Sequence, residues 1–172
     1  MKATLEAINQ MQADGVIGKY AIGGAVGATF YLEPAATVDL DVFVTLPVTR
    51  GGLLSLQGIY DYLKTRGGKV EDEYIVLGGW PVQFLPSGND LEQEAIAESV
   101  AIALEGVNTW VMKPEHLVAI ALRTGRSKDH IRILQFTEQG AVDRKKLTDV
   151  LNRHGLTSKW EQFERKYLEG HL

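Results

Sequence analysis

Apolar residues recur at two spacings along this chain, which together predict a mixture of helices and strands. Spacings of three or four residues, as in Leu5, Ile8 and Met11, are typical of helices with one buried face. Short β-branched runs bounded by glycine or proline are typical of strands. Helices are expected at residues 3–13, 25–32, 53–65, 91–99, 114–123, 128–138, 143–154 and 158–168. Strands are expected at residues 19–22, 38–45, 69–77, 80–85, 100–104 and 107–112.

Turn and capping residues separate these elements. Gly78-Gly79 predicts a two-residue β-hairpin, and Glu105-Gly106 predicts a second one. Either Asn89 or Asp90 is expected to cap the helix that follows it. In the helix expected at 128–138, we predict that Ile131, Leu134 and Phe136 face inward. No composition break marks a linker, so we predict one α+β domain over residues 1–172, with a core to about residue 112 and a helical C-terminal part from about 113.

Composition and charge narrow the class of protein. A chain of 172 residues with 45% apolar content suits one globular domain. The net charge of −4 argues against nucleic-acid binding through bulk charge, while it permits a local basic patch. The absence of cysteine excludes disulfides and thiolate metal sites, which fits a cytoplasmic protein. We expect no membrane span and no signal peptide, because no apolar run is long enough and residues 1–10 read as an amphipathic helix.

Two aspartates carry the strongest chemical signal. Asp39 and Asp41 lie in the β-prone run 38–44, where alternate side chains share one face. Adjacent carboxylates repel and raise each other's pKa unless a cation lies between them. Oxygen-only ligands suit Mg²⁺, which commonly binds one or two carboxylates together with substrate phosphates. Taken alone, the pair is equally well explained as the polar positions of an edge strand.

The segment before the acid pair adds an anion-binding feature. Gly23 and Gly24 follow a predicted strand and precede a predicted helix. Backbone N–H groups and the positive helix end at such a junction favour phosphate, so we expect these glycines to bind one. Thr37, in the next loop, has a hydroxyl that would either hold the loop or reach a phosphate.

Ile22-Gly23-Gly24, a short helix and Asp39-Leu40-Asp41-Val42 together resemble the signature of the DNA polymerase β-type nucleotidyltransferase superfamily. The resemblance implies a mixed β-sheet core with flanking helices. It implies that Asp39 and Asp41 hold Mg²⁺ or Mn²⁺, and that Gly23 and Gly24 bind a nucleoside triphosphate. The implied reaction transfers a nucleoside monophosphate to an acceptor hydroxyl, an in-line displacement of the kind that bound metal ions promote.

A second segment, from Lys113 to Asp129, resembles the abortive-infection toxin (AbiEii-type) branch of that superfamily. In that branch Arg-x-Lys-Asp opens a helix, as Arg126-Ser127-Lys128-Asp129 does here. The basic residues of this region form a cluster suited to binding the negative charge of a polyphosphate. They are Arg123, Arg126, Lys128 and Arg132. Composition alone favours solvated basic residues on a capped helix instead. Asp129 is expected either to orient Lys128 or to act in catalysis.

Three features depart from the superfamily pattern. A third acid is expected on a later strand, but Pro81-Val82-Gln83-Phe84-Leu85 places Gln83 there, and an amide cannot act as a general base. Ala35 stands where many relatives have arginine, and the gap between Gly24 and Asp39 is long. The acidic run Glu71-Asp72-Glu73 offers a substitute, although such a run entering a hairpin is usually a solvated face.

Three functions are consistent with these residues. The first is a nucleotidyltransferase whose acceptor would be tRNA, protein or another hydroxyl or phosphate compound. The second is a catalytically impaired module of the same fold that binds a nucleotide or partner, which Gln83 and Ala35 favour. The third, permitted by the resemblance to the toxin branch, is a toxin whose partner would be a cognate antitoxin.

Overall fold

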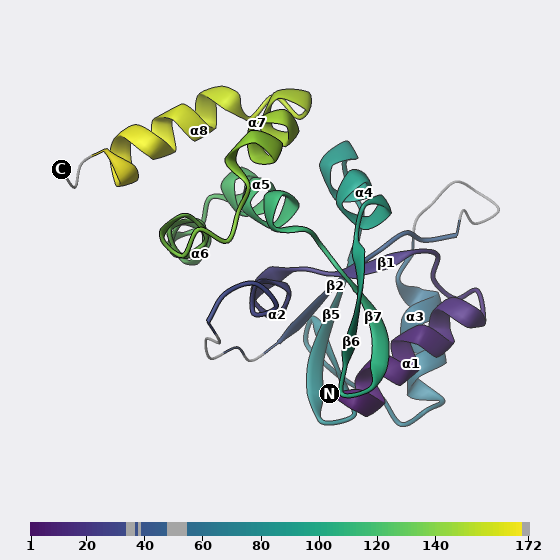
Figure 1. The fold of residues 1–172 in the computed structure, drawn as a ribbon. Coiled ribbons are helices and arrows are strands. Elements are labelled where there is room, and N and C mark those ends of the chain that lie inside the picture. Colours follow the sequence, from purple (N-terminus) through teal and green to yellow (C-terminus); the bar gives the residue numbers. More distant parts are fainter. Residues whose placement is uncertain (34–36, 38, 48–54, 170–172) are drawn as a thin grey trace.

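The computed structural model describes residues 1–33, 37, 39–47 and 55–169, which form a mixed sheet with helices on both sides (Figure 1). The seven-stranded sheet has the order β3-β4-β5-β2-β1-β7-β6. Its strands are β1 (Tyr20–Ile22), β2 (Leu40–Val44), β3 (Lys69–Glu71), β4 (Tyr74–Leu77), β5 (Trp80–Pro86), β6 (Val100–Leu104) and β7 (Val107–Val111). The helices are α1 (Lys2–Ala13), α2 (Gly24–Ala28), α3 (Gln57–Lys64), α4 (Asp90–Ala97), α5 (Pro114–Thr124), α6 (Ser127–Glu138), α7 (Arg144–Arg153), α8 (Thr157–Phe163) and the π-helical turn η1 (Glu164–Leu168).

Strand β2 lies in the middle of the sheet and sets its two faces. It pairs antiparallel with β1 and parallel with β5, and the parallel register places Asp41 beside Gln83. Leu40, Val42 and Val44 are fully buried on one face, as the alternation of apolar residues predicts. The side chains between them therefore point to the opposite face of the sheet.

Each face of the sheet has its own apolar core. On one side, Leu40, Val42 and Val44 pack with residues of α1 and α3, including Leu5 and Leu63. On the other side, the core joins sheet residues to α4, α5, α6 and α7 (Figure 1). The helical C-terminal part is joined to the sheet mainly through α2 and α4, which contact both β2 and α5. None of the helices within the described ranges is both long and apolar enough to cross a membrane.

The predicted turns and the predicted cap are confirmed. Both residues of Gly78-Gly79 and of Glu105-Gly106 have positive φ, as a tight hairpin turn requires. The side chain of Asn89, rather than that of Asp90, caps α4 by accepting a hydrogen bond from the backbone N–H of Glu92.

The single strand predicted at 69–77 is wrong, because the chain turns back within it. Strands β3 and β4 form a hairpin whose turn includes Asp72 at a φ of 53°. Aspartate tolerates this left-handed conformation better than most residues, and consecutive acids favour an exposed turn. The consequence is that Glu73 lies directly before β4 instead of inside a longer strand.

Three helix predictions also need correction. The helix predicted at 25–32 ends at Ala28, and turns follow it. The helix predicted at 53–65 begins at Gln57, and its first two predicted residues lie outside the described ranges. On α6, Ile131 is 58% exposed, whereas Ile133 and Phe136 are fully buried. The prediction that Phe136 faces inward is confirmed, and the prediction for Ile131 is wrong because Ile133 takes the buried position. Periodicity alone does not show which of two nearby apolar residues meets the core.

Candidate active site

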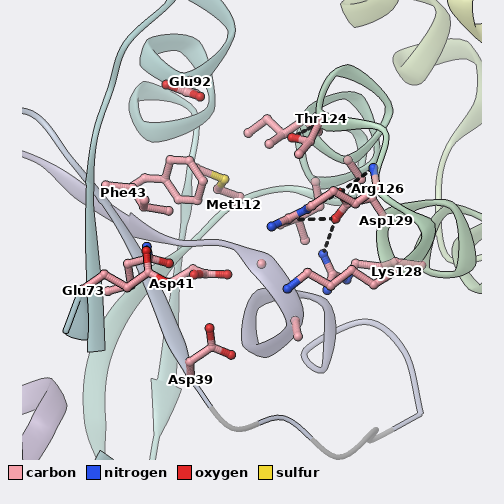
Figure 2. Close-up of a pocket in the computed structure, with 18 of the residues that line it drawn as sticks. Asp39, Asp41, Phe43, Glu73, Glu92, Met112, Thr124, Arg126, Lys128 and Asp129 are labelled. Atoms are coloured by element: carbon pink, nitrogen blue, oxygen red, sulfur yellow. Dashed lines mark hydrogen bonds and ion pairs between the residues drawn. The ribbon is translucent and has the colours of Figure 1, made fainter. Parts of the chain in front are cut away.

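A cavity of about 440 Å³ lies between the central strands and the junction of α5 with α6. Figure 2 shows acidic side chains on the sheet side and basic side chains on the helical side. Its charged and polar lining consists of Asp39, Asp41, Glu73, Tyr74, Gln83, Glu92, Thr124, Arg126, Lys128, Asp129 and Arg132. Phe43 and Met112 contribute apolar surface between the two sides. The cavity therefore has acidic side chains on its sheet wall and basic side chains on the facing helical wall.

The predicted acid pair lines this cavity. Asp41 belongs to β2, and Asp39 lies one residue before that strand begins. Burial and the negative charge of Asp39 raise the pKa of Asp41 to about 6, although Arg132, Lys128 and Arg126 pull it down. The pair therefore provides two close carboxylates whose joint ionisation is unfavourable without added positive charge.

Glycine is required beside Asp41 because the backbone of α2 approaches its carboxylate closely. Gly24 lines the cavity at a φ of +57°, and a Cβ there would overlap Oδ2 of Asp41. Gly23 also has no room for a side chain, since a Cβ would lie 2.6 Å from the ring of Phe43. The N–H of Gly23 donates to the carbonyl oxygen of Asp41 at 3.0 Å. That N–H is therefore used in fixing the loop to β2, and Gly24 is the glycine that meets the cavity.

Thr37 lies outside the residues that line the cavity. Its hydroxyl donates to the backbone carbonyl oxygen of Asp39 at 3.3 Å. This contact lies within the segment directly before β2, and the predicted contact of Thr37 with a phosphate stays a prediction. Ala35 lies outside the described residues.

Asp129 organises the basic side of the cavity. Its side chain is only 1% exposed and accepts hydrogen bonds from Nε of Arg126 at 2.7 Å and from the backbone N–H of Arg126 at 3.1 Å. Arg132 forms an ion pair with it at 3.5 Å. Burial raises the pKa of Asp129, but the hydrogen bonds and charges of these two arginines outweigh burial and leave the pKa below its usual value. Asp129 therefore orients arginines, and Lys128 lines the cavity beside them.

The basic cluster differs by one member from the predicted one. Arg123 turns away from the cavity, donating to Oδ1 of Asn89 at 2.6 Å and to the carbonyl oxygen of His154 at 3.4 Å. It thereby fastens α5 to the start of α4 and the end of α7. Arg132 lines the cavity, and its position three residues after Asp129 on one helix was the sequence signal for their contact.

Gln83 lies where the resemblance places a third acid, directly beside Asp41 and facing the cavity. Its Nε2 donates to Oε2 of Glu73 at 3.3 Å. Desolvation raises the pKa of Tyr74, and the negative charges of Asp39, Glu73 and Asp41 raise it further. Glu73 therefore belongs to the same charged environment as the acid pair. The sequence signal for it was weak, because the run 71–73 read as the solvated start of a hairpin strand.

The donor set fits a hard divalent cation that binds together with phosphate. Asp39 and Asp41 offer oxygen ligands from one strand end, and Mg²⁺ commonly binds one or two carboxylates plus substrate phosphates. Among the residues that the structure describes, no group of three His, Asp or Glu side chains is arranged to hold a metal ion. The protein would therefore supply two charged ligands, with phosphate oxygens and water completing the coordination shell.

Comparison with known proteins shows likeness in structure only. The sequence matches no protein-family description and no curated protein. An antigenic nucleotidyltransferase-like protein from Paracoccidioides brasiliensis has a TM-score of 0.55 at 12% identity, over 93% of this chain and 91% of that one. The solution structure of the antibiotic-resistance factor ANT(2'')-Ia has a TM-score of 0.52 at 16% identity, over 98% and 97%. The crystal structure of ANT(2'')-Ia with adenylyl-2''-tobramycin has a TM-score of 0.50 at 17% identity, over 91% and 98%.

These likenesses extend over nearly the whole of each chain, so they concern the sheet and the C-terminal helices together. They confirm the predicted α+β fold class. The finer resemblance to the abortive-infection toxin branch stays a prediction. With a mixed seven-stranded sheet and helices on both of its faces, the chain has a nucleotidyltransferase-like fold.

Proposed function

We propose that this protein is a metal-dependent nucleotidyltransferase that moves a nucleoside monophosphate from a nucleoside triphosphate to an acceptor. The observation that supports the proposal most strongly is that Asp39 and Asp41 line the same cavity as Arg126, Lys128 and Arg132. A metal–triphosphate complex needs both kinds of charge within a few ångströms. The nucleotidyltransferase-like fold supports the same conclusion.

The charged residues of the cavity have two proposed roles, holding the metal ion and binding the phosphate groups. Asp39 and Asp41 would hold Mg²⁺ or Mn²⁺, which when bound would polarise the transferred phosphoryl group and orient it for in-line attack. Arg126 and Lys128 would bind the phosphates that leave as pyrophosphate. Asp129 keeps Arg126 at the cavity wall through two hydrogen bonds from the guanidinium group, at 2.7 and 3.1 Å. Gly24 leaves the space that the Asp41 carboxylate occupies.

The acceptor is proposed by class. A tRNA or a protein hydroxyl is one class, and such a reaction would place the protein in the cytoplasm, where nucleoside triphosphates are available. The complex of ANT(2'')-Ia with adenylyl-2''-tobramycin adds small polyhydroxylated amines as a second class to test. If the acceptor is essential to the cell, the protein would act as a toxin, and a cognate antitoxin would be its partner.

A catalytically impaired nucleotide- or partner-binding module is the second candidate function. The observation that favours it is Gln83, which faces the cavity in register with Asp41 and cannot take up a proton. Such a module would bind a nucleotide through the same basic side chains and would not transfer a nucleoside monophosphate.

The test combines binding with transfer. The purified protein is incubated with α-labelled nucleoside triphosphates, Mn²⁺ or Mg²⁺, and tRNA, protein or tobramycin as acceptor, and thermal unfolding is followed with and without nucleotide. We expect a metal-dependent rise in Tm and labelled product, with Asp39→Asn abolishing the rise and lowering transfer at least about 100-fold. Asp61→Asn, an exposed position on α3, is the matched control and should change neither.

A different experimental outcome would favour or exclude each of the candidate functions. Metal-dependent binding without transfer to any acceptor or to water would favour the binding module. Transfer that Asp39→Asn leaves intact would contradict the assignment of the acid pair. Unchanged cell growth on expression of the chain alone would exclude a toxin.

A further inference from the structure

Glu73 lies at the end of a row of side chains that begins with Asp41. Asp41 is beside Gln83 in the parallel register of β2 and β5. The antiparallel register of β4 and β5 pairs Ile75 with Val82, so the next position brings Tyr74 opposite Gln83. Glu73 directly precedes Tyr74, in the turn where Asp72 has a φ of 53°. The hairpin turn therefore adds a carboxylate to the same edge of the cavity that holds the acid pair (Figure 2).

The contact between Gln83 and Glu73 links this carboxylate to β5. Nε2 of Gln83 donates to Oε2 of Glu73 at 3.3 Å, and both residues line the cavity. The neutral amide is thus in register with Asp41 on one side and hydrogen-bonded to Glu73 on the other. An amide here removes the repulsion that a third adjacent carboxylate would add, and it also holds Glu73 in place.

Nucleotide transfer to a hydroxyl group is faster when a base lies near the reacting atoms and accepts the hydroxyl proton. Asp39 and Asp41 are assigned to the metal ion. Asp129 is 1% exposed and is hydrogen-bonded by Arg126, so its lone pairs are engaged. Glu92 accepts a hydrogen bond from the backbone N–H of Gly88 at 2.7 Å and lies on α4, apart from the acid pair in Figure 2. Among the carboxylates that line the cavity, Glu73 best meets the requirement.

We infer that Glu73 accepts the proton of the attacking hydroxyl, taking the role that Gln83 cannot fill, and that Gln83 is its positioning residue. This inference rests on the proposed function. As the acceptor oxygen bonds to the α-phosphorus, its O–H bond breaks and the proton passes to the Glu73 carboxylate. The bond from the α-phosphorus to the bridging oxygen breaks, and pyrophosphate leaves with that oxygen. Glu73 is exposed, so it releases the proton to solvent.

The test separates binding from proton transfer. Glu73→Gln is compared with Glu71→Gln, an exposed acid two residues earlier that does not line the cavity. Binding of Mn²⁺ with an α,β-methylene ATP analogue is measured by calorimetry, and transfer to the best acceptor, or to water, is measured with labelled ATP. We expect Glu73→Gln to bind within about twofold of the unmodified protein and to lose about 10²- to 10⁴-fold in kcat, the usual contribution of a general base. Glu71→Gln should leave both measurements unchanged.

The split between KM and kcat supplies a further readout. Glu73→Gln should lower kcat and leave the KM for nucleotide within about twofold, because a general base acts on the reacting atoms and not on nucleotide binding. Gln83→Ala should likewise leave the KM for nucleotide unchanged and lower kcat less than Glu73→Gln does, whereas a loss of metal–nucleotide binding would show that Gln83 has only a structural role.

The possible outcomes separate a failure of the role of Glu73 from a failure of the proposed function. Transfer by Glu73→Gln at the unmodified rate would overturn the role of Glu73 and leave the proposed function standing. Loss of Mn²⁺–analogue binding in Glu73→Gln would also overturn it, because Glu73 would then act as a ligand. If the unmodified protein neither binds the analogue nor transfers label, the proposed function fails, and the role of Glu73 falls with it.

Discussion

At the scale of single residues, the main feature is a carboxylate placed where its charge is unfavourable. Asp41 is partly buried beside Asp39, and its pKa is raised to about 6 by burial and by that neighbouring charge. The positive charges of Arg132, Lys128 and Arg126 lower the pKa of Asp41, but not enough to return it to its usual value. A site of this kind gains from a metal ion, because the ion neutralises charge that the fold leaves uncompensated.

The raised pKa predicts that Asp41→Asn stabilises the metal-free protein. A group whose pKa is higher in the folded state loses stabilisation as pH rises, here between about pH 4 and pH 6. In EDTA at pH 7.5 we expect the free energy of unfolding of Asp41→Asn to exceed that of the unmodified protein by roughly 1–3 kcal/mol. Near pH 3 the difference should vanish, since Asp41 is then protonated in both states. Urea denaturation at the two pH values checks this.

The comparison with metal completes that prediction. Mn²⁺ with nucleotide should stabilise the unmodified protein and leave Asp41→Asn unchanged. If Asp41→Asn is less stable than the unmodified protein at pH 7.5 in EDTA, Arg126, Lys128 and Arg132 already balance the charge of Asp41 and this prediction is wrong.

At the scale of elements, α2 and β2 form the wall of the site through close backbone approach. Gly24 begins α2 against the Asp41 carboxylate, and Gly27 lies so near β1 that a Cβ would be 3.0 Å from the carbonyl oxygen of Ile22. Directly before β2, the hydroxyl of Thr37 donates to the backbone carbonyl oxygen of Asp39. The position of the acid pair thus depends on small residues that do not themselves bear charge.

Gly24→Ala is therefore expected to damage the site more than the fold. The new Cβ would displace the Asp41 carboxylate, and the φ of +57° adds strain of about 1–2 kcal/mol for a residue with a side chain. We expect a loss of roughly 1–3 kcal/mol in the free energy of unfolding and no Mn²⁺-dependent rise in Tm. Gly58→Ala on α3 is the matched control, because a Cβ there meets nothing within 4 Å. It should be neutral or stabilising by up to about 1 kcal/mol. Equal effects of the two substitutions would argue against this account of Gly24.

At the scale of the whole molecule, Glu94 joins three helices of the C-terminal half. It accepts from Nη2 of Arg153 at 2.6 Å, and it is bonded to Nε2 of His154 at 2.8 Å and to Nε2 of His116 at 3.0 Å. The hydrogen bond from Arg153, followed by those of the two histidines, lowers the pKa of Glu94 to about 2 despite burial. This contact fixes α4 to α5 and α7, and so supports the helical wall of the cavity.

Glu94→Ala should lower the free energy of unfolding by about 2–4 kcal/mol, because His116 is 1% exposed and would lose a buried partner. The control is Glu98→Ala, which removes a more exposed ion pair with Lys113 and should cost less than about 1 kcal/mol. Because the pKa of Glu94 is depressed, its contribution is present above about pH 4.5 and is lost as pH falls toward 2. Chemical denaturation at neutral and acid pH measures this, and similar losses for both variants would contradict it.

Local signals in the sequence indicated the acid pair, the glycine beside it, the Arg126-Ser127-Lys128-Asp129 helix start, and the hairpin turns at Gly78-Gly79 and Glu105-Gly106, although not the turn at Asp72. These depend on residues within a few positions of each other, where strand alternation, capping and positive φ act directly. The fold class followed, because the same signals repeat along the chain and match a known signature.

Tertiary structure alone decided which residues converge. Arg123 and Arg132 have the same charge, but the packing of α5 on α4 and α7 turns Arg123 away, while α6 points Arg132 at the cavity. Glu73 reaches the site only because β3 and β4 form a hairpin against β5. Glu94 meets His154 across 60 residues of chain. Such contacts depend on the free energy of packing whole elements together, which no short stretch of sequence contains.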